Sequence, residues 1–196
     1  MSEIIPKDYD CCHCSTLIFT ETDHFLNDSI LIERALDGDQ SAYRDLYDHH
    51  VDYLFRFLMQ FSQDRQIVAD WVQQSFIKAF VKLDKFKGKS QFRTWLFSIG
   101  INEMRSAKRK QKHHEKIEIG ENQLNLVEPE RDLDSWLSVR TAIQKLDDNK
   151  RLVFLLHEIE GYSHREIAEI LGVGESTSRT MLSRTKVKLR EILTGS

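Results

Sequence analysis

Hydrophobic positions recur at helical spacing along most of the chain. The clearest stripe begins just after Asp64 and consists of Ile67, Val68, Trp71, Val72, Phe76, Ala79, Phe80 and Leu83. Spacings of three and four residues place these side chains on one face of a helix, and Asp64 is a residue type that caps helix N-termini. The same spacing predicts three more helices upstream of residue 111, over residues 28–37, 40–61 and 91–110. Asn27 or Asp28 is expected to cap the first of these.

A second group of helices is predicted in the last third of the chain. Apolar spacing favours helices over about 136–146, 153–159, 163–171 and 175–193. Ser163 and Glu166 have the spacing of a capping box at the start of the third helix, and glycines at 172 and 174 mark a tight turn before the fourth. A short helix, a turn and a longer amphipathic helix are typical of a helix-turn-helix. A plain helical hairpin with a soluble outer face is the alternative.

Proline is almost absent from the chain. It occurs at Pro6 and Pro129, with 122 residues between them. Because folds of many short strands need turn residues every ~8–12 positions, the predicted fold class is all-α. Lost periodicity and many acidic residues around Pro129 predict a flexible acidic linker between two small helical domains. The predicted division is a tail at 1–27, a first domain at 28–112, the linker at 113–135 and a second domain at 136–196.

Charge is unevenly distributed along the chain. The formal net charge is −3, yet residues 85–116 contain ten Lys or Arg and two Glu, a sum of +8. A basic block in an acidic chain indicates contact with a polyanion such as nucleic acid. A solvated, charged helix end is the plainer interpretation of such a block taken alone.

The helix predicted over 91–110 has two stripes. The inward stripe is apolar and consists of Phe92, Trp95, Leu96 and Ile99. The other stripe is polar and consists of Thr94, Ser98, Asn102, Arg105 and Arg109. Gly100 predicts close packing at mid-helix, because glycine there costs about 1 kcal/mol relative to alanine. Phe86 and the lysines of the preceding loop combine an aromatic ring that can stack on an unpaired base with cations that follow a nucleic-acid backbone.

Three segments, in this order, carry a resemblance to one family. Residues 70–76 (DWVQQSF) resemble the DLVQETF-type segment of the extracytoplasmic-function sigma factors of bacterial RNA polymerase. Residues 86–97 (FKGKSQFRTWLF), with Asn102, look like the family's F(K/R)G-x-S-x-F-x-TWL segment. Residues 160–172 (EGYSHREIAEILG) are similar to its EG-x-SY-x-EIA-x-x-LG segment. The resemblance covers residues 28–193 and implies two helical domains joined by a linker.

The resemblance also implies partners and the residues that contact them. The clamp of the largest subunit of core RNA polymerase is expected to contact Asp70, Gln73, Gln74 and Lys78. The promoter −10 element, through flipped-out bases and adjoining duplex, is expected to contact Phe86, Lys87, Lys89, Ser90, Thr94, Ser98, Asn102, Arg105, Lys108 and Arg109. The −35 element is expected to contact Ser176, Thr177, Arg179, Thr180, Ser183 and Arg184. Further implied partners are the flap of the second-largest subunit and an anti-sigma factor.

The chain departs from the family pattern at several positions. The unusual residues are Gln74 in place of Glu, Asp147-Asp148 in place of Leu-Pro, His164 in place of Tyr, Ser178 in place of an aliphatic residue and Met181 in place of a basic one. The last two lie in the predicted recognition helix. The sequence therefore predicts the two-part promoter contact without giving the −35 preference.

The cysteines are confined to the predicted tail, as Cys11, Cys12 and Cys14. An odd number in one tail is not a disulfide framework. With His24 they offer soft ligands, but the spacing is cramped for a tetrahedral zinc site, so no metal is assigned. The tail is either an inert extension or a sensor of metal or thiol oxidation. The doublets His49-His50 and His113-His114 are expected at the surface.

No catalytic motif is recognisable, so the sequence predicts a non-enzymatic protein without a cofactor. Neither a signal peptide nor an apolar run of ~18 residues is visible, which predicts a cytoplasmic protein without membrane insertion. Two rival interpretations stay open. One is a stand-alone helix-turn-helix regulator that binds duplex DNA, and the other is a metal- or redox-sensing interaction protein that acts through its cysteine tail.

Overall fold

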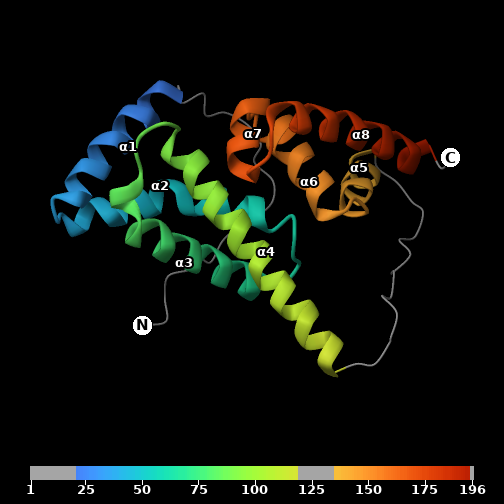
Figure 1. The fold of residues 1–196 in the computed structure, drawn as a ribbon, viewed down its shortest axis with the longest axis horizontal. Helices are drawn as coiled ribbons and strands as arrows, with labels where there is room; N and C mark the ends of the chain where they lie inside the picture. The colour runs from blue at the N-terminus through green and yellow to red at the C-terminus, as the bar shows by residue number, and fades with distance from the viewer. Residues whose placement is uncertain (1–20, 119–134, 195–196) are drawn as a thin grey trace.

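The computed structural model describes residues 21–118 and 135–194, with side chains described over 28–111 and 139–194. In these residues the regular elements are all helical, which confirms the all-α fold class (Figure 1). The first group of helices is α1 (Glu21–Leu36), α2 (Gln40–Leu58), α3 (Arg65–Val81), the 3₁₀ turn η1 (Leu83–Lys85) and α4 (Phe92–Glu118). The second group is α5 (Ser135–Gln144), α6 (Asp148–Phe154), the π-helical segment η2 (Leu155–Ile159), α7 (His164–Leu171) and α8 (Glu175–Thr194).

Local capping residues start several of these helices, as their sequence predicts. The Asp64 carboxylate accepts hydrogen bonds from the backbone N–H of Gln66 at 2.8 Å and of Ile67 at 3.3 Å, which confirms Asp64 as the cap of α3. The capping box of Ser163 and Glu166 is formed in both directions at the start of α7. Each cap satisfies backbone donors that the first helical turn leaves without a partner.

Gly100 lies where α4 packs closely against α2. A Cβ atom at this position would lie 2.8 Å from Cδ1 of Leu54, a side chain that is 0% exposed. Real Cβ contacts are not that short, so any larger residue here would force the Leu54 side chain to shift. The close packing predicted from a mid-helix glycine is confirmed.

The N-terminal end of the first group differs from the prediction. α1 begins at Glu21, so the predicted boundary between tail and first domain falls inside this helix. Asp28 is therefore not a cap; its carboxylate is buried and lies 3.0 Å from Nε2 of His50 on α2. The surface position predicted for His50 is also wrong. The ring is held inside because a buried acid needs a polar partner, and His50 supplies it.

α4 extends well beyond its predicted end near residue 110 and reaches Glu118. Its last turns project away from the other helices (Figure 1), where no core exists to impose an apolar period. No proline or glycine interrupts residues 101–118, so the helix continues on propensity alone. The remainder of the predicted linker, residues 119–134, lies outside the described residues, as do Cys11, Cys12 and Cys14 and the ligand role considered for them.

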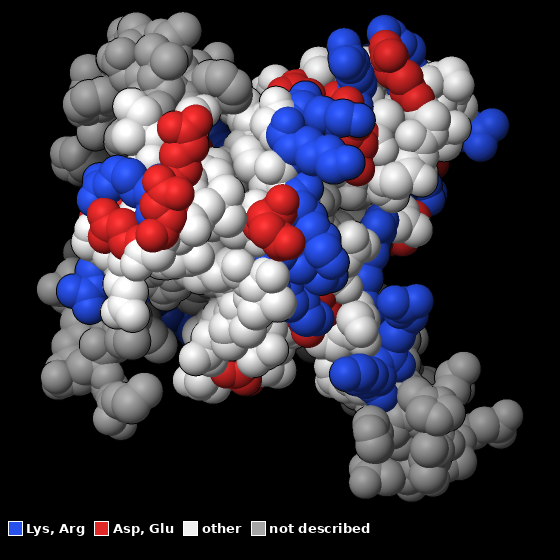
Figure 2. All heavy atoms as spheres, turned by 60° about the vertical axis from the view of Figure 1, so that its left-hand side comes forward, with Lys and Arg blue, Asp and Glu red and all other residues white. Residues whose placement is uncertain are grey.

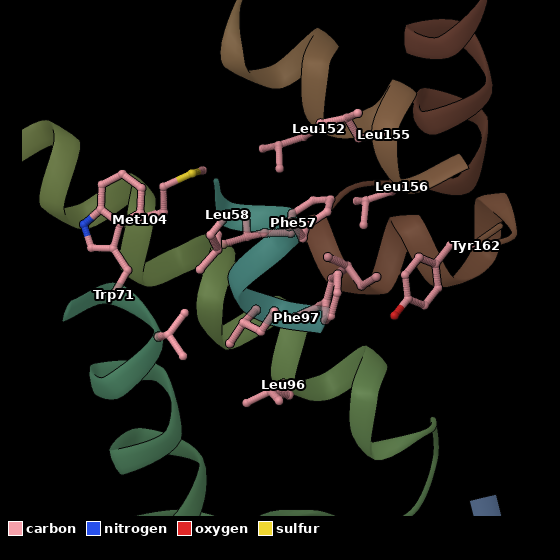
Figure 3. Close-up of a cluster of buried hydrophobic side chains, with 14 of the residues drawn as sticks. Phe57, Leu58, Trp71, Leu96, Phe97, Met104, Leu152, Leu155, Leu156 and Tyr162 are labelled. Atoms are coloured by element: carbon pink, nitrogen blue, oxygen red, sulfur yellow. The ribbon is translucent and has the colours of Figure 1, made fainter. Parts of the chain in front are cut away.

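The two helix groups share one apolar cluster. In Figure 3, Phe57 and Phe97 from α2 and α4 lie next to Leu156 and Tyr162 from the second group. The rings of Phe97 and Tyr162 are 5.8 Å apart, and Leu156 is 0% exposed. The second helix group is thus docked onto the first through buried side chains. Among the described helices, none combines the length and hydropathy needed to cross a bilayer.

Candidate polymerase and nucleic-acid interface

The outer face of α3 presents the four residues predicted to contact the polymerase. Asp70, Gln73, Gln74 and Lys78 are all exposed, while most of the opposite stripe is in the core. Ile67, which was predicted to belong to that stripe, is 37% exposed instead. The Lys78 ammonium forms an ion pair with Glu103 of α4. Ile77 and Val81 share this face and are 48% and 75% exposed, which the sequence analysis missed. Their helical spacing from Gln73 and Gln74 could have placed them on this face from the sequence. A face that mixes polar and apolar side chains suits a protein partner.

The loop before α4 holds an aromatic cluster. The Phe86 ring is half-buried, with its centroid 5.2 Å from that of Trp95 and 5.9 Å from that of Phe92. Phe92 is 1% exposed, as predicted for a core residue, and Trp95 is half-buried. The residues that remain outward are Lys87 and Lys89, with Ser90 half-buried. The loop therefore offers cations beside a partly accessible aromatic surface.

The polar stripe of α4 is only partly at the surface. Asn102 and Arg109 are exposed, and Ser98 is half-buried with its hydroxyl donating to the Trp95 carbonyl at 2.6 Å. Thr94 is 2% exposed and lies against the hydroxyl of Tyr162, which comes from the second helix group. Burial raises the pKa of the Tyr162 phenol, an effect that the Arg93 guanidinium opposes.

Arg105 and Lys108, at the far end of the stripe, have protein partners. Arg105 Nη2 donates to the Asn149 side-chain oxygen at 2.9 Å. Lys108 Nζ lies 2.9 Å from a carboxylate oxygen of Asp148, and the two side chains are 25% and 41% exposed. Burial lowers the pKa of Arg105, against the opposing effect of Asp148. Both cations are thus held near α6 in this conformation.

The outer face of α8 has the composition of a recognition helix. All six residues predicted for the −35 contact are exposed there: Ser176, Thr177, Arg179, Thr180, Ser183 and Arg184. Ser178 and Leu182 are buried on the opposite face, and α7 ends at Gly172 with a φ of 67°. Hydroxyl and guanidinium groups on an open helix face can reach base edges and phosphates in a major groove.

Two departures from the family pattern contact each other between α7 and α8. His164 Nδ1 lies 3.0 Å from the Ser178 hydroxyl. The His164 ring also stacks on His157, with centroids 4.5 Å apart and an interplanar angle of 18°. Desolvation and the neighbouring His157 lower the pKa of His164. This polar link between the two helices was not predicted, because neither residue alone indicates its partner.

Positive and negative side chains are separated on the surface of the molecule. Lys and Arg side chains form a broken band down the face shown in Figure 2, and many Asp and Glu side chains gather in a separate patch. No group of three or more His, Cys, Asp or Glu side chains in the described part of the chain is arranged to hold a metal ion. A band of cations is the kind of surface that a polyanion such as nucleic acid would approach.

Comparisons with known proteins identify relatives of both helix groups. Residues 46–114 match the family model for Sigma-70 region 2, and residues 136–189 match that for Sigma-70, region 4. RNA polymerase sigma factor NccH of Alcaligenes xylosoxydans xylosoxydans is 33% identical over 178 residues, covering 86% of this chain and 96% of that protein. The ECF RNA polymerase sigma-E factor of Haemophilus influenzae is 30% identical over 175 residues, covering 82% and 92%.

A solved structure matches the arrangement as a whole. It is CnrH in complex with the cytosolic domain of CnrY, with a TM-score of 0.63 and 28% identity, covering 87% of this chain and 99% of that one. The sigma factor RpoE from Bartonella quintana, solved with the anti-sigma factor NepR, has the same TM-score of 0.63 at 23% identity and shows the fold alone; the match covers 78% of this chain and 96% of that one.

Proposed function

Because the chain belongs to the extracytoplasmic-function sigma factors of bacterial RNA polymerase, we propose that it directs core polymerase to promoters with a −10 and a −35 element and promotes DNA melting. The observation that carries the proposal is the open face of α8, where all six predicted −35 residues are exposed. Family membership also sets aside the stand-alone duplex-binding regulator. The protein acts as an initiation factor without a catalytic step of its own, in the cytoplasm where polymerase transcribes.

Each candidate surface has one role in this proposal. The α3 face, with Asp70, Gln73, Gln74 and Lys78, binds the clamp of the largest subunit. The loop at 86–90 and the α4 stripe bind the −10 element, and α8 binds the −35 element while its domain rests on the flap. The two functional domains correspond to the two helix groups, within residues 21–118 and 135–194. An anti-sigma factor is a further proposed partner, supported by the relative CnrH, which was solved in complex with the cytosolic domain of CnrY.

Melting follows from the chemistry of the −10 surface. Each flipped base costs a few kcal/mol of stacking, which pocket contacts and nearby cations must offset. Asn102 is exposed on α4 and carries both a donor and an acceptor, so it can pair with the edge of an unstacked base. Three cations are also exposed, Arg109 on α4 and Lys87 and Lys89 in the loop before it. They can neutralise phosphates of the bound DNA.

The substitution Asn102→Ala tests this assignment. We expect unchanged affinity for core polymerase and an open complex weakened by about 1–3 kcal/mol, the usual worth of a specific base contact. Core binding is measured by co-elution, and melting by permanganate reactivity of unpaired thymines on a promoter that the protein uses. Gln63→Ala, at an exposed polar residue before α3, is the matched control. Equal loss of core binding and melting in Asn102→Ala would refute the assignment.

A further inference from the structure

A buried hydrogen bond joins α8 to α7. The Ser178 hydroxyl of α8 lies 3.0 Å from Nδ1 of His164, the first residue of α7. Ser178 is 0% exposed and His164 is half-buried, so water competes little for this bond. The buried residues of α7 are all apolar, namely Ile167, Ile170 and Leu171. Because apolar packing has no preferred direction and a hydrogen bond does, the polar contact can fix the orientation of α8 on α7.

A second histidine holds the His164 ring in this orientation. The ring of His157, in η2, stacks on that of His164 with centroids 4.5 Å apart and an interplanar angle of 18°. His157 Nδ1 lies 2.9 Å from the Tyr162 carbonyl oxygen, and since a carbonyl only accepts, this nitrogen is the donor. His164 is thus held from two elements, from η2 through the stacked ring and from α8 through the hydroxyl.

The charged groups around the two stacked rings favour a neutral His164. They are His157 and Glu158 of η2 and Glu175, Arg179 and Lys186 of α8. Desolvation, followed by the neighbouring His157, lowers the pKa of His164 below its usual 6.5. Each of the two acids is paired with a cation of α8, Glu175 with Arg179 and Glu158 with Lys186. The ring is therefore neutral at pH 7 and can accept a hydrogen bond through Nδ1.

We infer that the hydrogen bond between His164 and Ser178 sets the position of α8 and thereby the discrimination of the −35 element, a statement that rests on the proposed function. Ser178 is buried on the face of α8 opposite the six proposed DNA contacts, so it acts as a positioning residue. In a helix-turn-helix the recognition helix enters the major groove while the preceding helix crosses the backbone, so the angle between them matters. Both residues depart from the family pattern, so this contact is a feature of this chain.

Acid weakens this contact. A protonated His164 carries hydrogens on both ring nitrogens, so Nδ1 no longer accepts a hydrogen bond from the Ser178 hydroxyl. The new charge also lies near Arg179 and Lys186 and against the stacked His157 ring. Discrimination of the −35 element is therefore complete above about pH 6.5 and declines as the pH falls toward the lowered pKa of His164.

Two substitutions that each remove one buried hydroxyl from α8 separate this contact from general packing. Ser178→Ala removes the hydroxyl that reaches α7. Thr185→Val is the matched control, because Thr185 is also 0% exposed but donates within its own helix, to the Met181 carbonyl at 2.7 Å. A third variant, His164→Asn, keeps a hydrogen-bonding group near the position of Nδ1 but has no proton to gain in this pH range.

Discrimination is measured with the holoenzyme, as the ratio of its affinities for a promoter found by start-site mapping and for the same promoter with a scrambled −35 element. At pH 7.5 we expect Ser178→Ala to lower this ratio at least about threefold and Thr185→Val to keep it. At pH 5.5 the wild-type ratio should fall toward that of Ser178→Ala, whereas His164→Asn should keep its own. Equal ratios in Ser178→Ala and Thr185→Val, or an equal fall in wild type and His164→Asn, would overturn the inference.

Hydrogen exchange on the free full-length protein tests the positioning role without DNA. The backbone amides of α8 should exchange faster in Ser178→Ala than in Thr185→Val, and equal exchange would refute the positioning role. A wild-type protein that directs no specific transcript would refute the proposed function, while the exchange comparison still tests the contact. Specific transcripts from the wild type, with an unchanged discrimination ratio in Ser178→Ala, would refute the inference alone.

Discussion

Gly100 offers a sharp test of the packing that positions the DNA face of α4. Gly100→Ala removes the backbone entropy cost of glycine, a gain of about 1 kcal/mol in helix stability. The new methyl carbon would start 2.8 Å from Cδ1 of Leu54, which is 0% exposed and must therefore move within a filled core. Overpacking of this kind costs about 1–3 kcal/mol. We expect a net change between neutral and about 2 kcal/mol of lost stability.

The same substitution in a Leu54→Ala background separates the two effects. Leu54→Ala alone should cost about 2–5 kcal/mol, but it removes the carbon atoms that the new methyl group at position 100 would meet. Gly100→Ala should then stabilise by about 1 kcal/mol, through helix propensity alone. The expected coupling between the two sites is therefore about 1–3 kcal/mol.

Urea unfolding of the four proteins, followed by circular dichroism, measures this cycle. In a thermal melt of the same proteins, a difference of 1 kcal/mol would correspond to about 2–4 °C in Tm for a chain of this size. If Gly100→Ala stabilises equally with leucine or alanine at position 54, the close contact of α2 and α4 does not exist. The placement of Asn102, which follows Gly100 within one helical turn, would then lose its structural basis.

Two further predictions concern polar contacts between helices. Asp28→Ala should lower the free energy of unfolding in urea by about 1–3 kcal/mol, because it leaves the buried His50 ring without its acid. The double substitution Asp28→Leu with His50→Leu should lower it clearly less than this single substitution does. A larger loss in the double variant would contradict the prediction. For His164, a folded-state pKa below the usual 6.5 means that the unfolded chain binds more protons, so stability is complete above about pH 6.5 and declines as pH falls toward the folded value. His164→Gln should flatten the pH dependence of unfolding in that interval, and an unchanged profile would refute the contribution.

Local features of the fold were predictable from the sequence. The caps at Asp64 and Ser163 were predictable because each acts within one helical turn. The close packing at Gly100 was predictable because a glycine in the middle of a helix needs a physical reason to be there. The recognition face of α8 was likewise predictable in its exposure, because helical periodicity assigns each side chain to a face. Which DNA or polymerase group each residue contacts stays a prediction.

Long-range polar partners were not predictable in the same way. The pair of Asp28 and His50 joins residues 22 positions apart, and Lys108 meets Asp148 across 40 positions. Each of these residues also fits a surface or a cap when it is considered alone. Helical periodicity places Thr94 on the polar stripe of α4. Its burial could not be predicted, because it depends on Tyr162 from the other helix group. Periodicity describes one helix and carries no information about what docks on it.

Transcription of sheared DNA from the source organism tests the central claim most directly. Purified core polymerase is assayed with and without this protein, and the 5′ ends of the RNA products are mapped. We expect new start sites that share a two-part motif upstream, with the −10 and −35 parts at constant spacing. An absence of new start sites, with active core polymerase and with duplex DNA bound by the protein alone, would contradict the proposed function.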